Sequence, residues 1–318
     1  MKRLLIIAVT ALAALLCCAC APAQEQQLDD GRLRIVASDF PAYDFAREVC
    51  GNKAQISLLI KPGAELHSYE PAPKDIIRIQ ECDLFICNGG ESEEWIEDLL
   101  SGGELADTNI LRMMDCVDAV EESDEGIYGH EHEHDHDHEH EQVELDEHVW
   151  TSPVNAQSIV SAISDAASAA DPDNAEYYAV SAQAYCAQLA ELDAQLRAAV
   201  RDGARRTLIF ADRFPMRYFT LEYGLEYIAA FPGCSTETEP SAKMVAYLID
   251  RVREEQVPAV LYMEFSNERM ADVICEDTGC KKLPFYSAHN ITAEQFEAGV
   301  GYLDLMRINL KSLTEALS

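Results

Sequence analysis

The stretch AEYYAVSAQAYCAQLAELDAQLRAAVRDG, residues 175–203, decides the architecture of this chain. Its interior contains neither proline nor glycine, so it predicts one continuous helix of about 28 residues, a rod of roughly 40 Å. A second helical segment, residues 155–170, precedes it, and DPDN at 171–174 separates the two. A helix of this length in mid-chain is typical of a connection between two folded parts.

Short β-rich runs alternate with helical patterns on both sides of this helix. The runs before it are RLRIVAS (32–38), AQISLLI (54–60), DLFICN (83–88) and NILRMMD (109–115), and those after it are TLIFAD (207–212), LEYIAAF (225–231), AVLYMEF (259–265) and KLPFYSA (282–288). Strands that alternate with helices predict parallel βαβ units. We therefore expect an α/β fold of two lobes with parallel sheets, joined by one long rigid helix.

The expected boundaries follow from this pattern: an N-terminal lobe at 32–172, the linking helix at 173–203 and a C-terminal lobe at 204–318. Helices are expected at 42–49, 74–81, 93–100, 242–255, 267–277 and 294–317, and TAEQ at 292–295 has the form of a capping box. Ligands of such sheets bind at the carboxyl ends of the strands, so we expect a site in the cleft between the lobes.

The N-terminus is predicted to be an export signal. Lys2 and Arg3 precede an apolar run from Leu4 to Leu16, which is too short to span a bilayer. The cysteines that follow resemble a bacterial lipoprotein signal, with residues 1–19 removed, Cys20 lipidated and 20–31 as a tether. Cys18 is the alternative site, and an ordinary secretory peptide cut near Ala21 or Ala23 is the alternative process. In each case we expect a bacterial, exported protein, lipid-anchored at the outer face of the cytoplasmic membrane or periplasmic.

Composition restricts the class of partner. The 318 residues carry a formal net charge of −33, which excludes nucleic acid as a partner and favours cations. Between Glu121 and Glu147 there are 13 acidic residues and no Lys or Arg. Within this segment HEHEHDHDHEHE (130–141), called here the histidine row, has almost no apolar side chains, so the loop 121–144 is predicted to be disordered. Its imidazoles could hold zinc weakly as an accessory to the main site: His130, His132, His134, His136, His138 and His140.

Eight cysteines follow the signal segment, an even number that is compatible with disulfides in an exported protein. The alternative is that several of them are free cysteines, buried as small apolar side chains. Cys275 and Cys280 are close enough in sequence to pair, but the sequence does not determine the connectivity.

Three histidines lie outside the row: His67, His148 and His289. His67 and His289 each follow a predicted strand, on the edge where the two lobes should face each other. A single histidine is more often a surface or core residue than a ligand. Three of them near one cleft edge of an acidic, exported protein also fit a metal site, and the residue pattern alone leaves both interpretations open.

Two motifs make a resemblance specific. KPGAELHSYEPAPKDI (61–76) and DEHVWTSPVNA (146–156), with the histidine row between them and ETEPSAKMV (237–245) later, are similar to the zinc-uptake family of solute-binding proteins of ABC transporters. The similarity runs from about Leu33 to the C-terminus. It implies two lobes bridged by a rigid helix and a metal held between them by three histidines and often a carboxylate, with His67 and His148 as the first two ligands.

The chain departs from the family pattern at the third ligand. Where the family usually has a His-Asp pair, this chain has Ala211 and Asp212, whereas it offers His289 where many members have an aspartate. The resemblance thus implies His67, His148 and His289 as ligands. Asp212 is the favoured fourth ligand, Glu237 or Glu239 is the alternative carboxylate, and a helix cap or salt bridge is the alternative role of Asp212. Residues that could support the ligands or simply form the cleft wall are Tyr69, Glu70 and Trp150.

Three imidazoles and one oxygen suit Zn²⁺ better than Mn²⁺, which prefers more carboxylates. The resemblance implies a non-enzymatic protein that captures Zn²⁺ and delivers it to a membrane permease, and we expect it to be a monomer. A secreted zinc hydrolase is the alternative, because HEHEH (130–134) formally matches H-E-x-x-H, but that motif requires an apolar, buried helix. A surface adhesin or metal buffer is the third possibility that the sequence leaves open.

Overall fold

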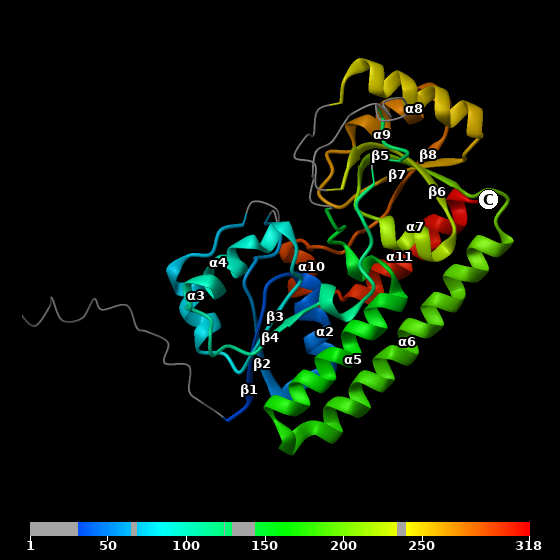
Figure 1. Ribbon diagram of the computed structural model, residues 1–318. Helices are drawn as coiled ribbons and strands as arrows, with labels where there is room; N and C mark the ends of the chain where they lie inside the picture. The colour runs from blue at the N-terminus through cyan, green and yellow to red at the C-terminus, as the bar shows by residue number, and fades with distance from the viewer. Residues whose placement is uncertain (1–30, 65–68, 124, 129–143, 234–239) are drawn as a thin grey trace, which may run out of the picture. The chain divides into compact units, whose positions relative to one another are not determined.

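The computed structural model describes residues 31–64, 69–123, 125–128, 144–233 and 240–318 (Figure 1). Residues 33–318 form one unit, and the account below concerns that unit alone. None of the helices in the described ranges combines the length and the apolar character that crossing a membrane would require. The signal segment, His67, the histidine row, Glu237 and Glu239 lie outside the described residues.

The N-terminal half contains a sheet of four parallel strands in the order β2-β1-β3-β4. Its strands are β1 (Leu33–Ala37), β2 (Ala54–Leu58), β3 (Leu84–Cys87) and β4 (Ile110–Arg112). Helix α2 (Phe40–Cys50) packs on one face of this sheet. Helices α5 (Pro153–Ala170) and α6 (Ala175–Asp202) pack against α2. Helices α3 (Pro73–Gln80) and α4 (Glu94–Gly102) cover the other face. All four predicted strands are confirmed.

The second half repeats this topology, with the parallel order β6-β5-β7-β8. Its strands are β5 (Thr207–Phe214), β6 (Glu226–Pro232), β7 (Ala259–Tyr262) and β8 (Lys281–Pro284). Alternate residues of β5 face opposite cores: Leu208 and Phe210 point towards α7 (Arg217–Tyr223) and α11 (Tyr302–Ala316), whereas Ile209 and Ala211 point towards α8 (Ala242–Glu255) and α9 (Arg269–Thr278). The α/β fold of two parallel-sheet lobes and a long helix is therefore confirmed.

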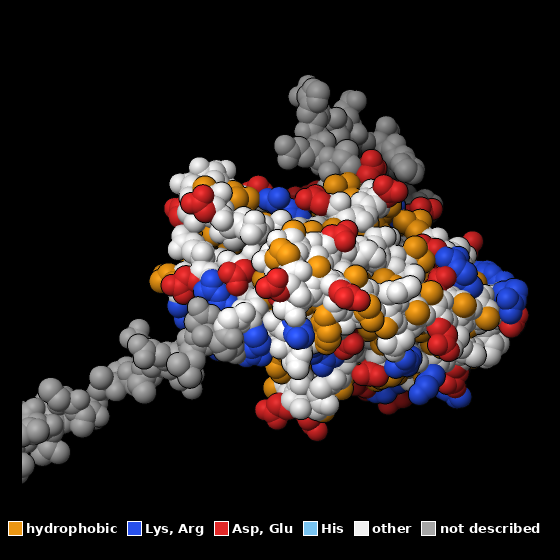
Figure 2. Space-filling model, turned by 90° about the horizontal axis from the view of Figure 1, so that it is seen from below, with side chains coloured by type: hydrophobic (Ala, Val, Ile, Leu, Met, Phe, Trp, Pro, Cys, Tyr) orange, Lys and Arg blue, Asp and Glu red, His pale blue; other side chains and the backbone are white. Residues whose placement is uncertain are grey.

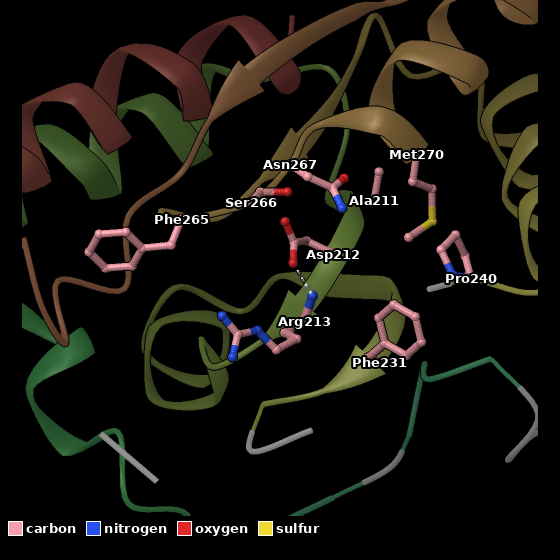
Figure 3. Close-up of a pocket in the computed structure, with 9 residues that line it drawn as sticks. All are labelled: Ala211, Asp212, Arg213, Phe231, Pro240, Phe265, Ser266, Asn267 and Met270. Atoms are coloured by element: carbon pink, nitrogen blue, oxygen red, sulfur yellow. Dashed lines mark hydrogen bonds between the residues drawn. The ribbon is translucent and has the colours of Figure 1, made fainter. Parts of the chain in front are cut away.

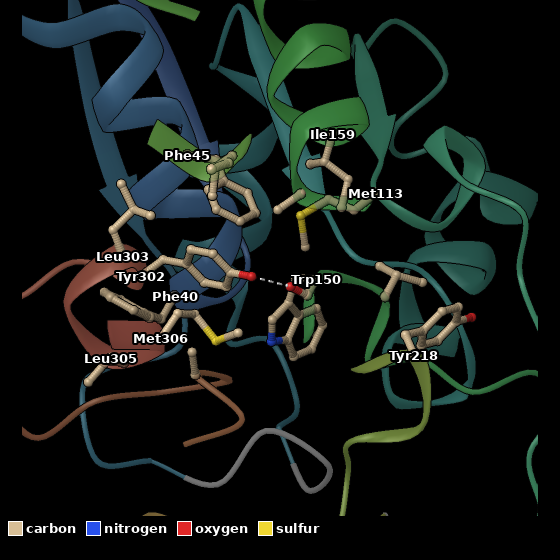
Figure 4. Close-up of a cluster of buried hydrophobic side chains, with 14 of the residues drawn as sticks. Phe40, Phe45, Met113, Trp150, Ile159, Tyr218, Tyr302, Leu303, Leu305 and Met306 are labelled. Carbon is tan, nitrogen blue, oxygen red and sulfur yellow. Dashed lines mark hydrogen bonds between the residues drawn. The ribbon is translucent and has the colours of Figure 1, made fainter. Parts of the chain in front are cut away.

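The 28 residues of α6 form the single long helix that the sequence predicts (Figure 1). One face of it is buried along its whole length. Its buried side chains are Tyr178, Ala182, Tyr185, Leu189, Leu192, Leu196 and Val200. They belong to one apolar cluster that continues from β1 through α2, α5 and α6 to β5 and α11. Figure 4 shows the centre of this cluster, where Trp150, Phe45, Tyr302 and Met306 meet.

The single helix expected from Glu294 to Leu317 is in fact two helices, α10 (Ala293–Glu297) and α11. Gly299 has φ +74°, a left-handed conformation that ends α10, and Gly301 caps α11 while its N–H donates to Asp304 Oδ2 (3.1 Å). The capping box at Thr292 and Gln295 is confirmed, with each side chain accepting from the other's backbone N–H. Helix α7, which follows β5, was not anticipated from the sequence.

After β8 the chain crosses back to the N-terminal sheet, and it then runs beside α6. The side chain of Asn290 donates to the carbonyl oxygens of Lys61 (3.0 Å) and Ala64 (2.7 Å), and the N–H of Tyr302 donates to Asp44 Oδ2 (2.7 Å). Helix α11 then packs on α6, and the carbonyl of Leu317 accepts from the N–H of Ala204 (2.7 Å). Helix α6 and the segment 285–302 therefore both connect the two sheets.

Another crossing precedes the histidine row. Residues 120–122 pair with 144–146, as Glu122 N donates to the carbonyl of Glu144 (2.9 Å). Residues 126–128 instead extend the edge of β6, where Ala229 N donates to the carbonyl of Gly126 (2.9 Å) and Tyr128 N donates to the carbonyl of Ala229 (3.1 Å). The described residues just before the histidine row, 126–128, therefore lie beside the second sheet, and those after it, 144–146, pair with 120–122.

The buried face of α6 should dominate its contribution to stability. Leu196 is fully buried, so Leu196→Ala should lower the free energy of unfolding by about 2–5 kcal/mol, measured by urea denaturation with far-ultraviolet circular dichroism. Val180 on the same helix is 60% exposed, so Val180→Ala should change it by no more than about 0.5 kcal/mol. Equal losses in the two variants would contradict the assigned buried face.

Candidate metal centre

His148 lies in the segment before α5 and is almost completely buried, with 2% of its surface exposed. Asp146 accepts two hydrogen bonds from it through Oδ1, one from the backbone N–H (2.9 Å) and one from ring Nδ1 (3.1 Å). The Asp-x-His spacing closes this short loop and fixes the ring. Because Asp146 engages Nδ1, a metal ion would be bound through Nε2.

Asp146 and His148 shift each other's pKa. Burial alone would lower the pKa of His148, but the Asp146 carboxylate outweighs this effect and raises the pKa above its ordinary value. Burial would likewise raise the pKa of Asp146, yet His148 and then Arg217 lower it. The pair is held from the second lobe as well, because Tyr218 Oη donates to the carbonyl of Asp146 (2.8 Å).

His289 follows β8 and is held in the same manner by Glu264, which follows β7. Ser287 Oγ donates to Glu264 Oε1 (2.6 Å) and lies 2.7 Å from His289 Nδ1, while Nδ1 itself lies 3.1 Å from Glu264 Oε1. These contacts favour the tautomer with a proton on Nδ1 and a lone pair on Nε2. Burial would raise the pKa of Glu264, but the hydrogen bonds from His289 and Ser287 lower it.

The backbone around His289 is strained. Ala288, directly before it, has φ +62°, and Phe265 and Glu268 in the loop after β7 have φ +62° and +57°. Side chains other than glycine rarely adopt this left-handed region, and such residues are found preferentially at functional sites. Phe265 is 46% exposed, and its ring lies edge-on to that of His289, with centroids 5.9 Å apart.

Two hydrogen bonds link chain segments that carry or precede the predicted histidines. The indole Nε1 of Trp150 donates to the carbonyl of Ser287 (2.8 Å), which joins the segment of His148 to that of His289. Asn290, next to His289, donates to the carbonyl of Ala64, three residues before His67 in the sequence. The segments that carry or adjoin all three histidines are therefore linked.

Trp150 thus positions a site segment in addition to packing in the core, because its carbonyl also accepts from Tyr302 Oη (2.7 Å; Figure 4). Tyr69 packs edge-on against Trp95, with centroids 6.1 Å apart, which matches the alternative interpretation of a wall residue. Glu70 is exposed.

Asp212 lies at a bulge of β5, where three residue steps from Phe210 to Arg213 face two steps from Ala229 to Phe231. Its carboxylate accepts from the N–H of Arg213 (2.9 Å) and from the N–H of Met263 (3.2 Å). It lines a pocket of about 190 Å³ with Phe265 and Pro240 (Figure 3). Ala211, at the place of the family's usual histidine, is buried in the core beneath α8 and α9.

Within the described ranges, no three His, Cys, Asp or Glu side chains lie close enough together to hold a metal ion. His148, His289 and Asp212 do not complete a site by themselves. Any complete ligand set therefore needs a residue from outside those ranges.

A second pocket, of about 460 Å³, is lined by six carboxylates: Glu91, Glu93, Glu94, Glu97, Asp115 and Glu144. Glu144 raises the pKa of Glu91, so the two negative charges lie close together. Arg112 lines the same pocket and pairs with Glu97. Elsewhere the charges are more mixed, and Figure 2 shows acidic and basic side chains interspersed over one face.

Sequence reasoning missed the residues that hold the rings, namely Asp146, Glu264 and Ser287. Asp146 and Ser287 each stand two residues before a histidine, and Glu264 comes shortly after β7, so a search for polar residues at these positions could have found them. The contact of Glu264 with His289 is not visible in the sequence, because 25 positions separate the two.

Comparison with known proteins agrees with the motifs. The family of the periplasmic zinc-uptake complex component A, ZnuA, matches residues 35–316. The high-affinity zinc uptake system protein ZnuA of Bacillus subtilis is 34% identical over 289 residues, which cover 90% of this chain and 88% of the relative. The zinc-binding lipoprotein AdcA of Streptococcus pneumoniae is 32% identical over 99% of this chain, which spans 61% of AdcA.

The fold agrees with solved structures too. The Zn(II)-bound ZnuA-like domain of Streptococcus pneumoniae AdcA superposes with a TM-score of 0.74 and 28% identity, over 90% of this chain and 99% of that domain. The match of family motifs, of almost the whole chain and of both parallel sheets shows that this chain belongs to the ZnuA family of zinc-uptake solute-binding proteins.

Proposed function

We propose that this protein captures Zn²⁺ outside the cytoplasmic membrane and delivers it to the permease of an ABC transporter. The observation that carries the proposal is the pair of buried histidines, His148 and His289, each held at Nδ1 by a carboxylate. Such carboxylate–histidine pairs are the usual support of zinc ligands. The relatives named for zinc uptake and zinc binding support the same metal.

The proposed ligands are Nε2 of His67, His148 and His289 with one carboxylate. Neutral imidazoles and a single oxygen give the four-coordinate set that zinc favours, whereas manganese would need more oxygen ligands. The hydrogen bonds of Trp150 to Ser287 and of Asn290 to Ala64 support a common location for the three histidine-bearing segments.

Two sources can supply the carboxylate. Asp212 lines a pocket whose wall includes Phe265, the residue that contacts the ring of His289, but two backbone N–H groups already bond to its carboxylate. Glu239 directly precedes Pro240 in the sequence, Glu237 stands three positions before it, and Pro240 lines the same pocket.

We also propose export with lipidation at Cys20, a tether at 20–31, lobes at 32–172 and 204–318 joined by the helix of 173–203, and a monomeric protein. The basic and apolar signal pattern and the naming of a relative as a lipoprotein support the anchor. The permease is the membrane partner that the family's place in an uptake complex supports.

The histidine row is proposed to be an accessory that collects zinc. Its ends start from Tyr128, at the edge of β6, and from Glu144, which lines the acidic pocket. Closely spaced carboxylates produce a field that attracts cations and speeds their capture. Zinc held weakly in the row would therefore add to the supply for the proposed tight site.

Binding rather than hydrolysis is proposed because the family is one of solute-binding proteins. Calorimetric zinc titration beside an assay with a chromogenic ester separates the two functions. Zinc-dependent ester turnover would favour the hydrolase.

The first prediction concerns the ligands. His67→Ala, His148→Ala and His289→Ala should each weaken binding of the tight zinc by at least about 100-fold, because each removes one of four bonds to the metal. Competition with a chelator of known zinc affinity measures this loss.

His134→Ala is the matched control, since this residue of the histidine row should leave the tight affinity unchanged. In the same assay Asp212→Ala identifies the carboxylate: a loss comparable to the histidine variants makes Asp212 the ligand. Unchanged affinity with lower stability makes it a cap and points to Glu237 or Glu239. Full affinity in His289→Ala would remove His289 from the site.

The second prediction concerns the carboxylates that hold the rings. Asp146→Asn and Glu264→Gln should each weaken zinc binding about 10–100-fold at pH 8. The reason is that the amide introduced in each variant holds the Nδ1–H of the histidine less strongly than the carboxylate does. For Asp146→Asn the pH dependence should also change.

Asp146 raises the pKa of His148, so protons compete with zinc from a higher pH in the parent protein than in the variant. As the pH falls, the parent should lose affinity first, and the midpoint of the loss should move to lower pH in Asp146→Asn. An unmoved midpoint, with zinc affinity measured from pH 8 to 5, would show that Asp146 has only a structural role.

The third prediction concerns the histidine row. Deleting residues 129–142 should remove several weak zinc equivalents and slow zinc loading at low metal concentration, measured by stopped flow with a fluorescent zinc chelator. The tight site should keep its affinity within about twofold. If the deletion abolished tight binding, the division into a core site and an accessory would be wrong, and an unchanged loading rate would reduce the row to a charged spacer.

A further inference from the structure

Cys275 and Cys280 lie beside each other at the end of the second sheet where β8 begins. Cys275 belongs to the last turn of α9 and Cys280 directly precedes β8. Their sulfur atoms are 3.4 Å apart, and both side chains are half-buried. A covalent disulfide is about 2.05 Å long, so the sulfurs need to approach by only about 1.4 Å, which small side-chain rotations can provide.

The turn between them holds this approach in place. Gly279 has φ +77°, the left-handed conformation that reverses the chain after a helix, and its N–H donates to the carbonyl of Cys275 (2.9 Å). Thr278 Oγ1 donates to the carbonyl of Ile274 (2.7 Å) and accepts from the N–H of Cys280 (3.3 Å). The backbone thus brings Cys280 back over the helix end without any bond between the sulfurs.

The remaining described cysteines are engaged differently. Cys50 and Cys87 are buried, as small apolar residues in a core are. Three others lie near a backbone carbonyl oxygen that their thiols can donate to: Cys82 to Ile79 (3.1 Å), Cys116 to Arg112 (3.3 Å) and Cys186 to Gln157 (3.6 Å).

We propose that Cys275 and Cys280 form a disulfide once the protein reaches an oxidising compartment. This inference rests on the proposed export of the chain, but not on zinc binding. Both thiols lose a proton and together two electrons, and a disulfide oxidant, such as an exported thiol oxidase or oxidised glutathione, is reduced to two thiols.

The exchange has two steps. Burial and the hydrogen bond with Cys280 raise the pKa of the Cys275 thiol. One of the two thiols loses its proton and attacks the oxidant, which expels one of its sulfurs as a thiolate. The other thiol then loses its proton and attacks the first sulfur, which releases the second half of the oxidant. The neighbouring sulfur is already in place for this step.

The location gives the disulfide a structural role. Helix α9 starts just after the loop of Glu264 and Phe265, and β8 leads to Ser287 and His289. The bond would fasten the far ends of α9 and β8, the two elements whose near ends bring Glu264 to His289. It therefore stabilises the register of these elements and leaves the ligands themselves untouched.

Peptide mapping gives a direct test, because trypsin releases Met270–Lys281 as one peptide that holds both cysteines and no other. The full chain is purified from an exporting host, or equilibrated with oxidised and reduced glutathione, and then alkylated without reduction. We expect this peptide to be two hydrogen atoms lighter and unalkylated, and to take two alkyl groups only after reduction. Two alkyl groups without reduction, or a link from either residue to another cysteine, would overturn the proposal.

Thermal unfolding tests the structural role. Oxidation should raise the Tm of the parent protein by a few degrees, and Cys275→Ser and Cys280→Ser should abolish that redox dependence. Cys186→Ser is the matched control and should retain it. Zinc affinity should differ less than twofold between the oxidised and reduced forms, and a Tm independent of redox state in the parent would contradict a stabilising bond. If zinc binding itself failed, the peptide and Tm results would still decide on the disulfide.

Discussion

The candidate site depends on one constraint, which is the attachment of the segment 287–290 to the N-terminal half of the chain. Hydrogen bonds hold this segment to that half both before and after His289. Trp150 binds the carbonyl of Ser287, and Asn290 binds the carbonyls of Lys61 and Ala64. Because Trp150 is fully buried, its indole N–H would be expensive to leave without an acceptor. The position of the second-half histidine is therefore set by first-half residues, although the whole of α5 and α6 lies between the two sheets in the chain.

The same constraint explains how buried charge is tolerated. A carboxylate in an apolar interior tends to be protonated, since burial disfavours its charged form. Asp146 and Glu264 are both buried, yet their pKa values are lowered: Asp146 accepts hydrogen bonds from His148 and lies in the field of Arg217, and Glu264 accepts hydrogen bonds from His289 and Ser287. Such a pair keeps the proton on Nδ1, so the ring presents Nε2 as the metal-binding nitrogen. The hydrogen bonds that stabilise the two buried carboxylates are therefore the same ones that orient the histidine rings for binding zinc.

The sequence was sufficient for features with a local cause. Strand alternation, the uninterrupted helix of 175–202 and the capping box at Thr292 each depend on neighbours in the chain, and all were predicted. The break at Gly299–Gly301 was missed because apolar spacing on its two sides is compatible with one helix. The bulge at Asp212 and the contact of Glu264 with His289 depend on residues from another strand, which no local pattern contains. The segment 126–128 joins β6 for the same reason, as its partner Ala229 is a hundred residues away.

Asp212 shows how the departure from the family pattern can be accommodated. Ala211 occupies the family's usual histidine position, but its side chain points into the core beneath α8 and α9, and the bulge after it turns Asp212 towards β7. There the carboxylate accepts from Met263 N–H, directly before Glu264, which in turn holds Ser287 and His289. Hydrogen bonds therefore connect Asp212, at the bulge of β5, through the loop of Met263 and Glu264 to the imidazole of His289. Asp212 therefore braces the loop after β7, on which the position of His289 depends.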